Sequence, residues 1–262
     1  DRKEGIVTGI EVYLNDVKVY PVNYVAQIGE NKYETLADAV AAAQAGDTIE
    51  IIKAGTYKIP NLPKNVTIKG AVDEVVLDCT GSGSIASVPN GATFENVTMN
   101  FGTSNYHGFQ HAGTINMKDC ELNGLFFSYG DMNFTECTFN APGSDYSMWA
   151  YAGNLNYTDC VFNGAGKFVN VYNEGNANTY TITATGCTFN STKVNKAAFN
   201  VKETCNSTAL KYKVVISDCT TNENFPAAKE DGALLVIDPL VQVDDRKEGI
   251  VTGIEVYLND VK

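Results

Sequence analysis

From about residue 62 onward, apolar and polar residues alternate in short stretches that recur along the chain. The clearest examples are TINMKDCELN at 114–123, DMNFTECTFN at 131–140 and NLNYTDCVFN at 154–163. Alternation with a period of two is typical of a β-strand that has one buried face. A polar pair such as Lys118-Asp119 interrupts the alternation, and a second short apolar stretch follows. Each stretch therefore predicts two short strands joined by a bend.

A third short strand is expected before each of these stretches. We expect the two outer residues of this strand to point into the core and the middle residue to point outward, because the outer residues are nearly always bulky. On this register, Tyr129, Trp149 and Tyr151 belong to the core and not to a sugar-binding surface. The segments that we align in this way are FQH at 109–111, FSY at 127–129, WAY at 149–151, VNV at 169–171 and FNV at 199–201.

One cysteine recurs in the second strand of successive stretches, without any paired C-x-x-C motif. Repeats of roughly 20 residues or more, each with three short strands, predict a right-handed parallel β-helix of about seven coils. The fold class is therefore all-β. A single thiol per coil favours a stack of small, buried side chains over a metal or redox site. The members of this predicted core ladder are Cys120, Cys137, Cys160, Cys187 and Cys219.

An asparagine follows each cysteine by three residues in most of these stretches, as Asn123, Asn140 and Asn163 do. Stacked asparagine side chains can hydrogen-bond along the edge of a sheet, and asparagine tolerates left-handed backbone better than most residues. We therefore expect these residues to form a structural ladder with left-handed backbone at a corner of the coil.

The segment before the repeats predicts a helix followed by a strand. Thr35 can cap the helix, Asp38 lies three residues later, and Gly46 is expected to end it. TLADAV at 35–40, GDTI at 46–49 and GTY at 55–57 resemble the amino-terminal cap of pectate-lyase-like parallel β-helix proteins. Such proteins include repetitive bacterial and archaeal surface proteins of the adhesin type. The resemblance implies an N-terminal capping helix and an extracellular or cell-surface location.

The two ends of the chain carry the same sequence: residues 1–18 recur unchanged at 245–262. This duplication predicts a tandem array in which residue 245 begins the next copy, and an engineered or cloning-derived duplication is the alternative. We divide the chain into a β-hairpin or linking segment at 1–23, a capped β-helix at 24–244 and the start of the next repeat at 245–262. Asn15-Asp16 is a good two-residue hairpin turn between strand-like segments.

A strand without its partner exposes unpaired backbone groups, so we expect the duplicated segment to dock on a neighbouring unit and to join units end to end. The partners are then further copies of the same unit. The residues expected to make this contact are Ile6, Ile10, Val12 and Leu14 in the first copy, and Ile250, Ile254, Val256 and Leu258 in the second.

Composition argues against several other functions. The net charge of −12 makes nucleic acid an unfavourable partner, and no apolar run suggests insertion into a membrane. The resemblance extends to lyases and methylesterases that use an arginine, but Arg2 and Arg246 are the only arginines. His107 and His111 are expected to lie in a strand or loop, with His111 in the core. We therefore expect no catalytic residue, no metal and no cofactor.

One apolar stripe is predicted to face outward on adjacent coils, because its members flank the residues assigned to the core. Such a stripe is a candidate contact surface for a glycan or a neighbouring fibre, unless the loop at 173–179 covers it. The leading function is a structural repeat of an extracellular fibre or adhesin. A carbohydrate-binding module is the alternative, and a polysaccharide lyase or hydrolase is the third. The candidate surface consists of Phe126, Met148, Phe168, Asn170 and Tyr172.

Overall fold

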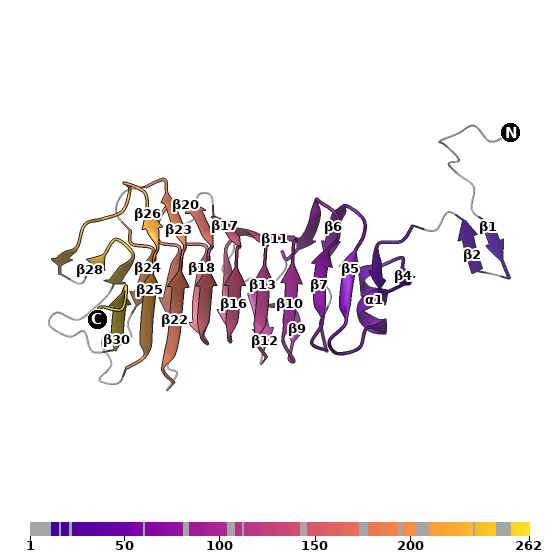
Figure 1. Ribbon diagram of the computed structural model, residues 1–262, viewed down its shortest axis with the longest axis horizontal. Coiled ribbons are helices and arrows are strands. Elements are labelled where there is room, and N and C mark those ends of the chain that lie inside the picture. The colour runs from indigo at the N-terminus through magenta and orange to yellow at the C-terminus, as the bar shows by residue number, and fades with distance from the viewer. Residues whose placement is uncertain are drawn as a thin grey trace.

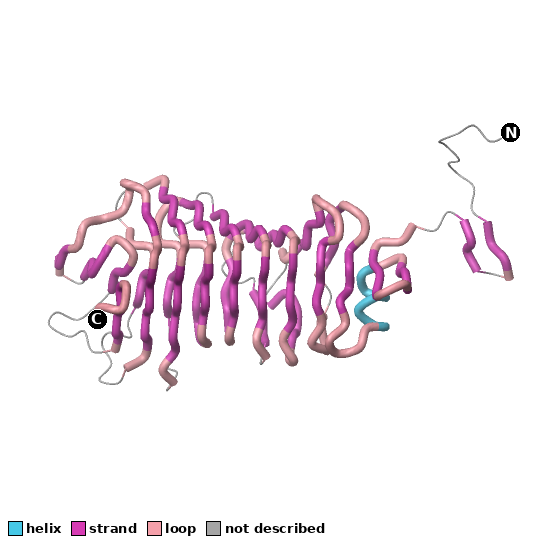
Figure 2. Tube along the Cα trace, in the orientation of Figure 1, coloured by secondary structure: helices cyan, strands magenta, loops and turns pink. Residues whose placement is uncertain are grey.

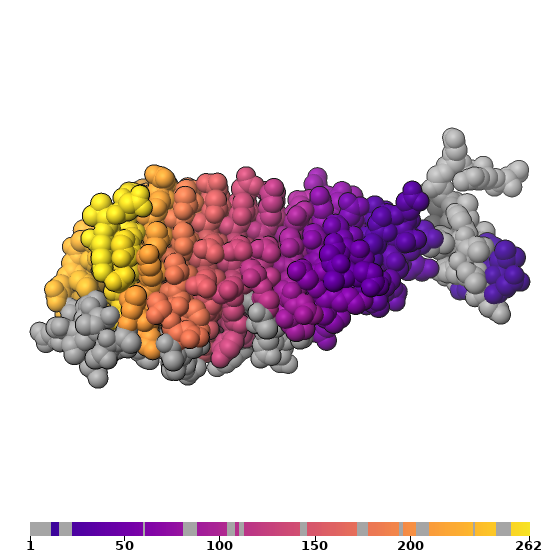
Figure 3. Space-filling view, turned by 60° about the horizontal axis from the view of Figure 1, so that its bottom comes forward, coloured from indigo at the N-terminus to yellow at the C-terminus, as the bar shows by residue number. Residues whose placement is uncertain are grey.

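The computed structural model describes residues 12–15, 17–20, 23–59, 61–80, 84–103, 108–111, 113–141, 146–172, 178–193, 196–202, 210–232, 234–244 and 253–262. In this part of the chain the fold is nearly all β, with a single helix (Figures 1 and 2). The strands stack into an elongated body, along which the chain advances steadily from one end to the other (Figure 3).

Three long sheets, parallel over most of their strands, run along this body. The eleven-stranded sheet contains, in spatial order, β30 (Ile254–Leu258), β25 (Tyr212–Ser217), β22 (Tyr180–Thr185), β19 (Leu155–Thr158), β16 (Met132–Thr135), β13 (Ile115–Lys118), β10 (Ala92–Glu95), β7 (Thr67–Gly70), β5 (Thr48–Ile51), β3 (Ala26–Ile28) and β4 (Asn31–Tyr33). The eight-stranded sheet contains β26 (Thr220–Thr221), β23 (Thr188–Ser191), β20 (Val161–Gly164), β17 (Thr138–Ala141), β14 (Glu121–Gly124), β11 (Thr98–Gly102), β8 (Val75–Asp78) and β6 (Gly55–Lys58).

The nine-stranded sheet contains β27 (Lys229–Asp231), β28 (Leu234–Asp238), β29 (Val241–Asp244), β24 (Phe199–Lys202), β21 (Val169–Tyr172), β18 (Met148–Ala152), β15 (Phe126–Tyr129), β12 (Gly108–His111) and β9 (Ser84–Val88). β1 (Val12–Leu14) and β2 (Val17–Tyr20) form a separate antiparallel pair. Consecutive strands from β7 to β26 belong to the three sheets in turn, and each strand from β10 to β26 pairs with the strand three places earlier. This arrangement is compatible with a β-helix.

The core lies between the three sheets and consists of columns of apolar side chains. Ile115, Met132 and Leu155 occupy one register position on successive strands, and all three are fully buried. Phe139, Phe162 and Phe189 form a second column, whose neighbouring rings stack with centroids 4.4 and 4.7 Å apart. Alternation in the sequence thus places one face of each strand in the core.

The bend between the first and second strands of each repeat is formed by a residue in the left-handed region. Asp119, Glu136 and Asp159, each preceding a ladder cysteine, have φ values of 52°, 55° and 53°. The prediction that the asparagines adopt left-handed backbone is therefore wrong. The left-handed residue is the one at the bend, and the asparagines lie within the second strands. Their expected hydrogen-bonded ladder is confirmed: Asn140 donates to Asn123, and Asn163 donates to Asn140, at 3.0 Å in each case.

Helix α1 (Leu36–Ala42) begins where the sequence predicts it. The side chain of Thr35 accepts a hydrogen bond from the backbone N–H of Asp38 at 3.1 Å. The helix buries Leu36, Ala39 and Val40, and it packs at the end of the body that holds β3, β4 and β5. It ends four residues before Gly46. Among the described residues, no helix is both long and apolar enough to span a membrane.

Candidate inter-unit joint

The second copy of the duplicated segment forms the last strand of the eleven-stranded sheet. β30 pairs in parallel with β25, and this pairing places Ile254 beside Tyr212, Val256 beside Val214 and Leu258 beside Ile216. These three residues of β30 continue the core columns of the preceding strands. Ile254 is 9% exposed, and Val256 and Leu258 are half-buried against the core. The alternation of IEVYL therefore matches the register that the sheet requires.

The backbone at both ends of β30 also completes the edge of β25. The N–H groups of Lys211 and Tyr212 donate to the carbonyl oxygen of Gly253, at 2.9 and 3.1 Å. At the other end, the N–H of Asn259 donates to the carbonyl oxygen of Ile216 at 2.9 Å. The side-chain oxygen of Asn259 accepts from the N–H of Asp218 at 3.0 Å. Without β30, these groups, which lie in β25 and directly beside it, would be left on an open sheet edge.

The outward face of β30 adds polar contacts. The Lys213 ammonium lies 4.7 Å from the centroid of the Tyr257 ring, which links β25 to β30. Glu255 accepts hydrogen bonds from Lys262 at 2.6 Å and from the Tyr257 hydroxyl at 3.0 Å. The hydrogen bond from Lys262 lowers the pKa of the Glu255 carboxyl. Lys262 is exposed, and Lys213, Glu255 and Tyr257 are half-buried, so water weakens these contacts and they orient the strand more than they stabilise it.

The first copy of the same segment has a different environment. β1 pairs antiparallel with β2, and Leu14 lies opposite Val17, which confirms the expected hairpin. Val12 and Leu14, the equivalents of Val256 and Leu258, are 44% and 64% exposed. Figure 1 shows β1 and β2 beyond the α1 end, at the opposite end of the molecule from β30. Ile6, Ile10 and Ile250, which were also expected to make the joint, lie outside the described residues.

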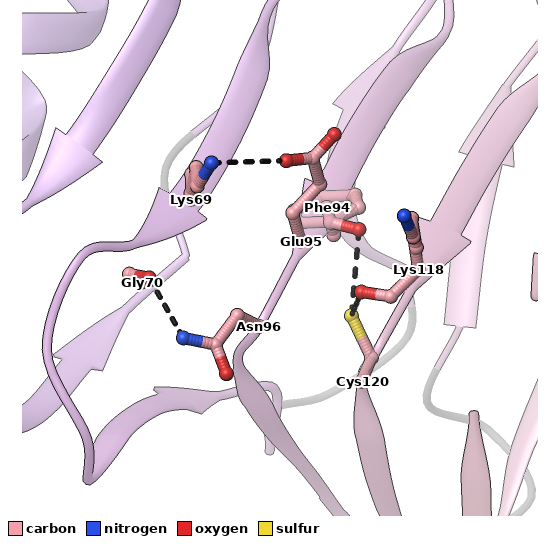
Figure 4. A network of polar contacts seen from close by, with 7 residues as sticks. All are labelled: Lys69, Gly70, Phe94, Glu95, Asn96, Lys118 and Cys120. Atoms are coloured by element: carbon pink, nitrogen blue, oxygen red, sulfur yellow. Dashed lines mark hydrogen bonds and ion pairs between the residues drawn. The ribbon is translucent and has the colours of Figure 1, made fainter. Parts of the chain in front are cut away.

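The cysteine ladder is a structural feature of the core. Cys120, Cys137, Cys160 and Cys187 are buried, Cys219 is half-buried, and none of them forms a disulfide. Each thiol contacts the carbonyl oxygen two residues earlier and a second carbonyl oxygen on the neighbouring strand of the eleven-stranded sheet. Figure 4 shows this for Cys120, whose sulfur lies 3.3 Å from the Lys118 oxygen and 3.4 Å from the Phe94 oxygen. Contact with the neighbouring thiol of Cys137, together with burial, raises the pKa of Cys120.

The described residues contain no group of three or more histidine, cysteine or acidic side chains that could hold a metal ion. His107 lies outside the described residues, and of His111 only the backbone, at the end of β12, is described. The expectation that His111 lies in the core is therefore untested.

The predicted outward stripe is wrong. Phe126, Met148 and Phe168 are at most 1% exposed, and Phe126 lies beside Met148 in an inward column. Along β15 and β18 the assumed register is shifted by one residue, and such a shift moves every side chain to the other face. Asn170 is also buried, and it accepts a hydrogen bond from Asn200 at 2.9 Å. The side chain of Tyr172 lies outside the described residues.

The same shift places aromatic residues that were assigned to the core on the outer face of the nine-stranded sheet. Phe127 lies beside Trp149, Tyr129 is 54% exposed, and Trp149 and Tyr151 are half-buried. The Trp149 and Tyr151 rings stack with centroids 5.5 Å apart, and Tyr129 lies 6.1 Å from Tyr151. From the sequence, Tyr129, Trp149 and Tyr151 were considered as a sugar-binding surface but assigned to the core, so this exposed cluster was not predicted. We call Phe127, Tyr129, Trp149 and Tyr151 the aromatic cluster.

Comparisons with known proteins add no relative. No protein-family model matches the chain, and neither the curated proteins nor the solved structures gave a match.

Proposed function

We propose that this chain is a non-catalytic structural repeat of an extracellular fibre or cell-surface adhesin, whose units join end to end through the duplicated segment. One observation carries the proposal. The segment is docked in register on β25 in its second copy, and in its first copy the equivalent apolar residues Val12 and Leu14 are exposed. A strand that fits a sheet edge on one unit and is exposed on another can link the two by strand addition.

The body suits such a fibre. We infer that it is a right-handed parallel β-helix of about seven coils, capped by α1, of the pectate-lyase-like type. Two observations support this inference: consecutive strands belong to the three sheets in a regular order, and apolar side chains form continuous columns in the core. Stacked coils of this kind make a stiff rod, and repeated rods give a fibre reach. The helix position and the motifs around Thr35 and Gly46 support the assignment of the cap.

In the proposed joint, residues 1–18 of one unit take the position that residues 245–262 occupy here. Only residues 21–25 separate β2 from β3, so the next body would begin close to the joint. If units are covalently linked, the docked tail is the start of the following unit. If they are separate chains, the tail of each chain fills its own acceptor edge and keeps that chain monomeric until another first copy displaces it.

Deleting residues 245–262 is expected to convert the monomer into polymers. The deletion exposes the edge of β25, and the first copy of another molecule can then occupy it. Sedimentation velocity across a concentration series should show growing species, and electron microscopy should show filaments. Removing residues 1–18 as well should restore the monomer. A single deletion variant that stays folded and monomeric at every concentration would contradict the proposal.

A second candidate function is glycan binding, which the aromatic cluster favours. Half-exposed aromatic rings on adjacent strands offer apolar faces to a pyranose ring, and the hydroxyls of Tyr129 and Tyr151 can hydrogen-bond it. Trp149→Ala combined with Tyr129→Ala should weaken retention in affinity gels that contain a neutral β-glucan by about tenfold or more. Tyr24→Ala, which removes a 40% exposed tyrosine elsewhere, is the matched control. Equal retention of all variants would eliminate this candidate.

A further inference from the structure

A hollow of about 240 Å³ lies at the β30 end of the body, where the core columns stop. Its walls come from all three sheets and the turn before β29, and they are more polar than apolar. Leu258 and Asn259, which belong to the duplicated segment, form part of the wall. Cys219, the half-buried member of the thiol ladder, forms another part. The lining residues are Ile216, Cys219, Thr221, Asp238, Pro239, Leu240, Leu258 and Asn259.

The chain leaves β30 through a turn whose first residue, Asn259, matches Asn15 after β1. Asn259 and Asp260 both have positive φ, at 46° and 65°, as Asn15 has at 49°. Val261 then pairs back on Leu258, with reciprocal backbone hydrogen bonds of 2.8 and 3.0 Å. In the first copy, the equivalent residues Leu14 and Val17 are paired in the same way. The second copy therefore contains the start of the same hairpin.

The pairing of the first copy indicates where the rest of the second strand would lie. In β1 and β2, Val12 is opposite Tyr20, and opposite residues of an antiparallel pair share one face of the sheet. Val12 corresponds to Val256, which belongs to an inward column of the body. A Tyr20 equivalent on the free edge of β30 would thus lie over the open end of the core.

We propose that the whole hairpin, and not its first strand alone, forms the joint, with Tyr20 of the following unit closing the hollow beside Cys219. This inference rests on the proposed function and names the second element of the same contact. A tyrosine suits the site, because its ring can cover Ile216, Leu240 and Leu258 while its hydroxyl reaches the polar groups of Thr221 or Asp238.

The test extends the full chain after Lys262 by Val-Tyr-Pro-Val, the residues that follow Lys18 in the first copy. The readout is the rate at which N-ethylmaleimide modifies Cys219, followed by peptide mass spectrometry. Cys205, which lies outside the described residues, is replaced by serine so that it does not compete for the reagent. We expect the extension to slow this reaction by about tenfold, because a covered thiol reacts only when the cover opens. The buried thiols Cys137 and Cys160 serve as internal controls that should not change.

The matched control is an extension of equal length, Val-Ser-Pro-Val, which lacks the ring. Slower modification with tyrosine than with serine supports the inference, and equal rates for the two extensions overturn it. The proposed function is tested separately, by polymer formation on deletion of 245–262. Polymers formed by that variant together with equal Cys219 rates would leave the strand joint standing and eliminate only the role of Tyr20.

Discussion

Replacing both Val256 and Leu258 with aspartate is expected to release β30 and to destabilise the protein by about 3 kcal/mol or more. Both side chains pack against the core, and a carboxylate there would lose its hydration without gaining a partner. The matched variant makes the same change at Val12 and Leu14, which are exposed, and should unfold like the parent chain. Thermal unfolding followed by circular dichroism measures both.

Comparing these two variants shows whether the loss of stability comes from the release of β30 or simply from the added negative charge. The altered sequences are identical, so a difference in stability can come only from where each copy lies. The second-copy variant should also associate, because its free β25 edge accepts the first copy of another molecule. A chain that carries all four changes should be destabilised and monomeric. Equal destabilisation by the two double variants would contradict the account.

The second large effect is a difference in stability between alanine substitutions at two adjacent residues of β15, Phe126 and Phe127. Phe126→Ala should cost about 3–5 kcal/mol, because it leaves a cavity in the column that Phe126 shares with Met148. Phe126 also stacks on Phe101, with ring centroids 4.4 Å apart. Phe127→Ala, on the outer face, should cost about 1 kcal/mol. Urea unfolding of the two variants gives both values, and a larger loss for Phe127→Ala would show that the observed register is wrong.

Much of the architecture could be predicted because the relevant signals are local. Alternation in segments such as 114–123 indicates strands with one buried face, and the structure has those strands. Thr35 and Asp38 mark the start of α1 by a hydrogen bond that depends only on neighbouring residues. The recurrence of the cysteines predicts equivalent positions, and the four central thiols are buried.

The register of the third strands could not be predicted in the same way. Phe126 and Phe127 are both large and apolar, as are Met148 and Trp149, so alternation does not decide which of them enters the core. Aligning 127–129 and 149–151 with 169–171 placed the wrong residue inside. The sheet pairs Met148, and not Trp149, with Val169, and a bulge follows Ser128. Pairing with the neighbouring strands of the sheet, which sequence alone does not display, decides the register.

The two states of the duplicated segment could not be predicted from its sequence either. Residues 12–14 and 256–258 are identical, so their different environments come from what lies beside them. The second copy follows β29 and pairs with the edge of β25, whereas the first copy precedes α1. Sequence could predict a strand that pairs with a sheet edge, and the structure shows that the second copy pairs with β25.

The central claim is that the acceptor edge on β25 binds the first copy of the segment, and the most direct test uses a synthetic peptide of residues 1–18. The peptide is added to the chain that lacks residues 245–262, and binding is measured by native mass spectrometry. We predict one peptide per chain, with loss of the polymers that this variant forms alone. A peptide with aspartate at Val12 and Leu14 should do neither. If the parent peptide does not bind the folded deletion variant, or binds no better than the aspartate peptide, the account is contradicted.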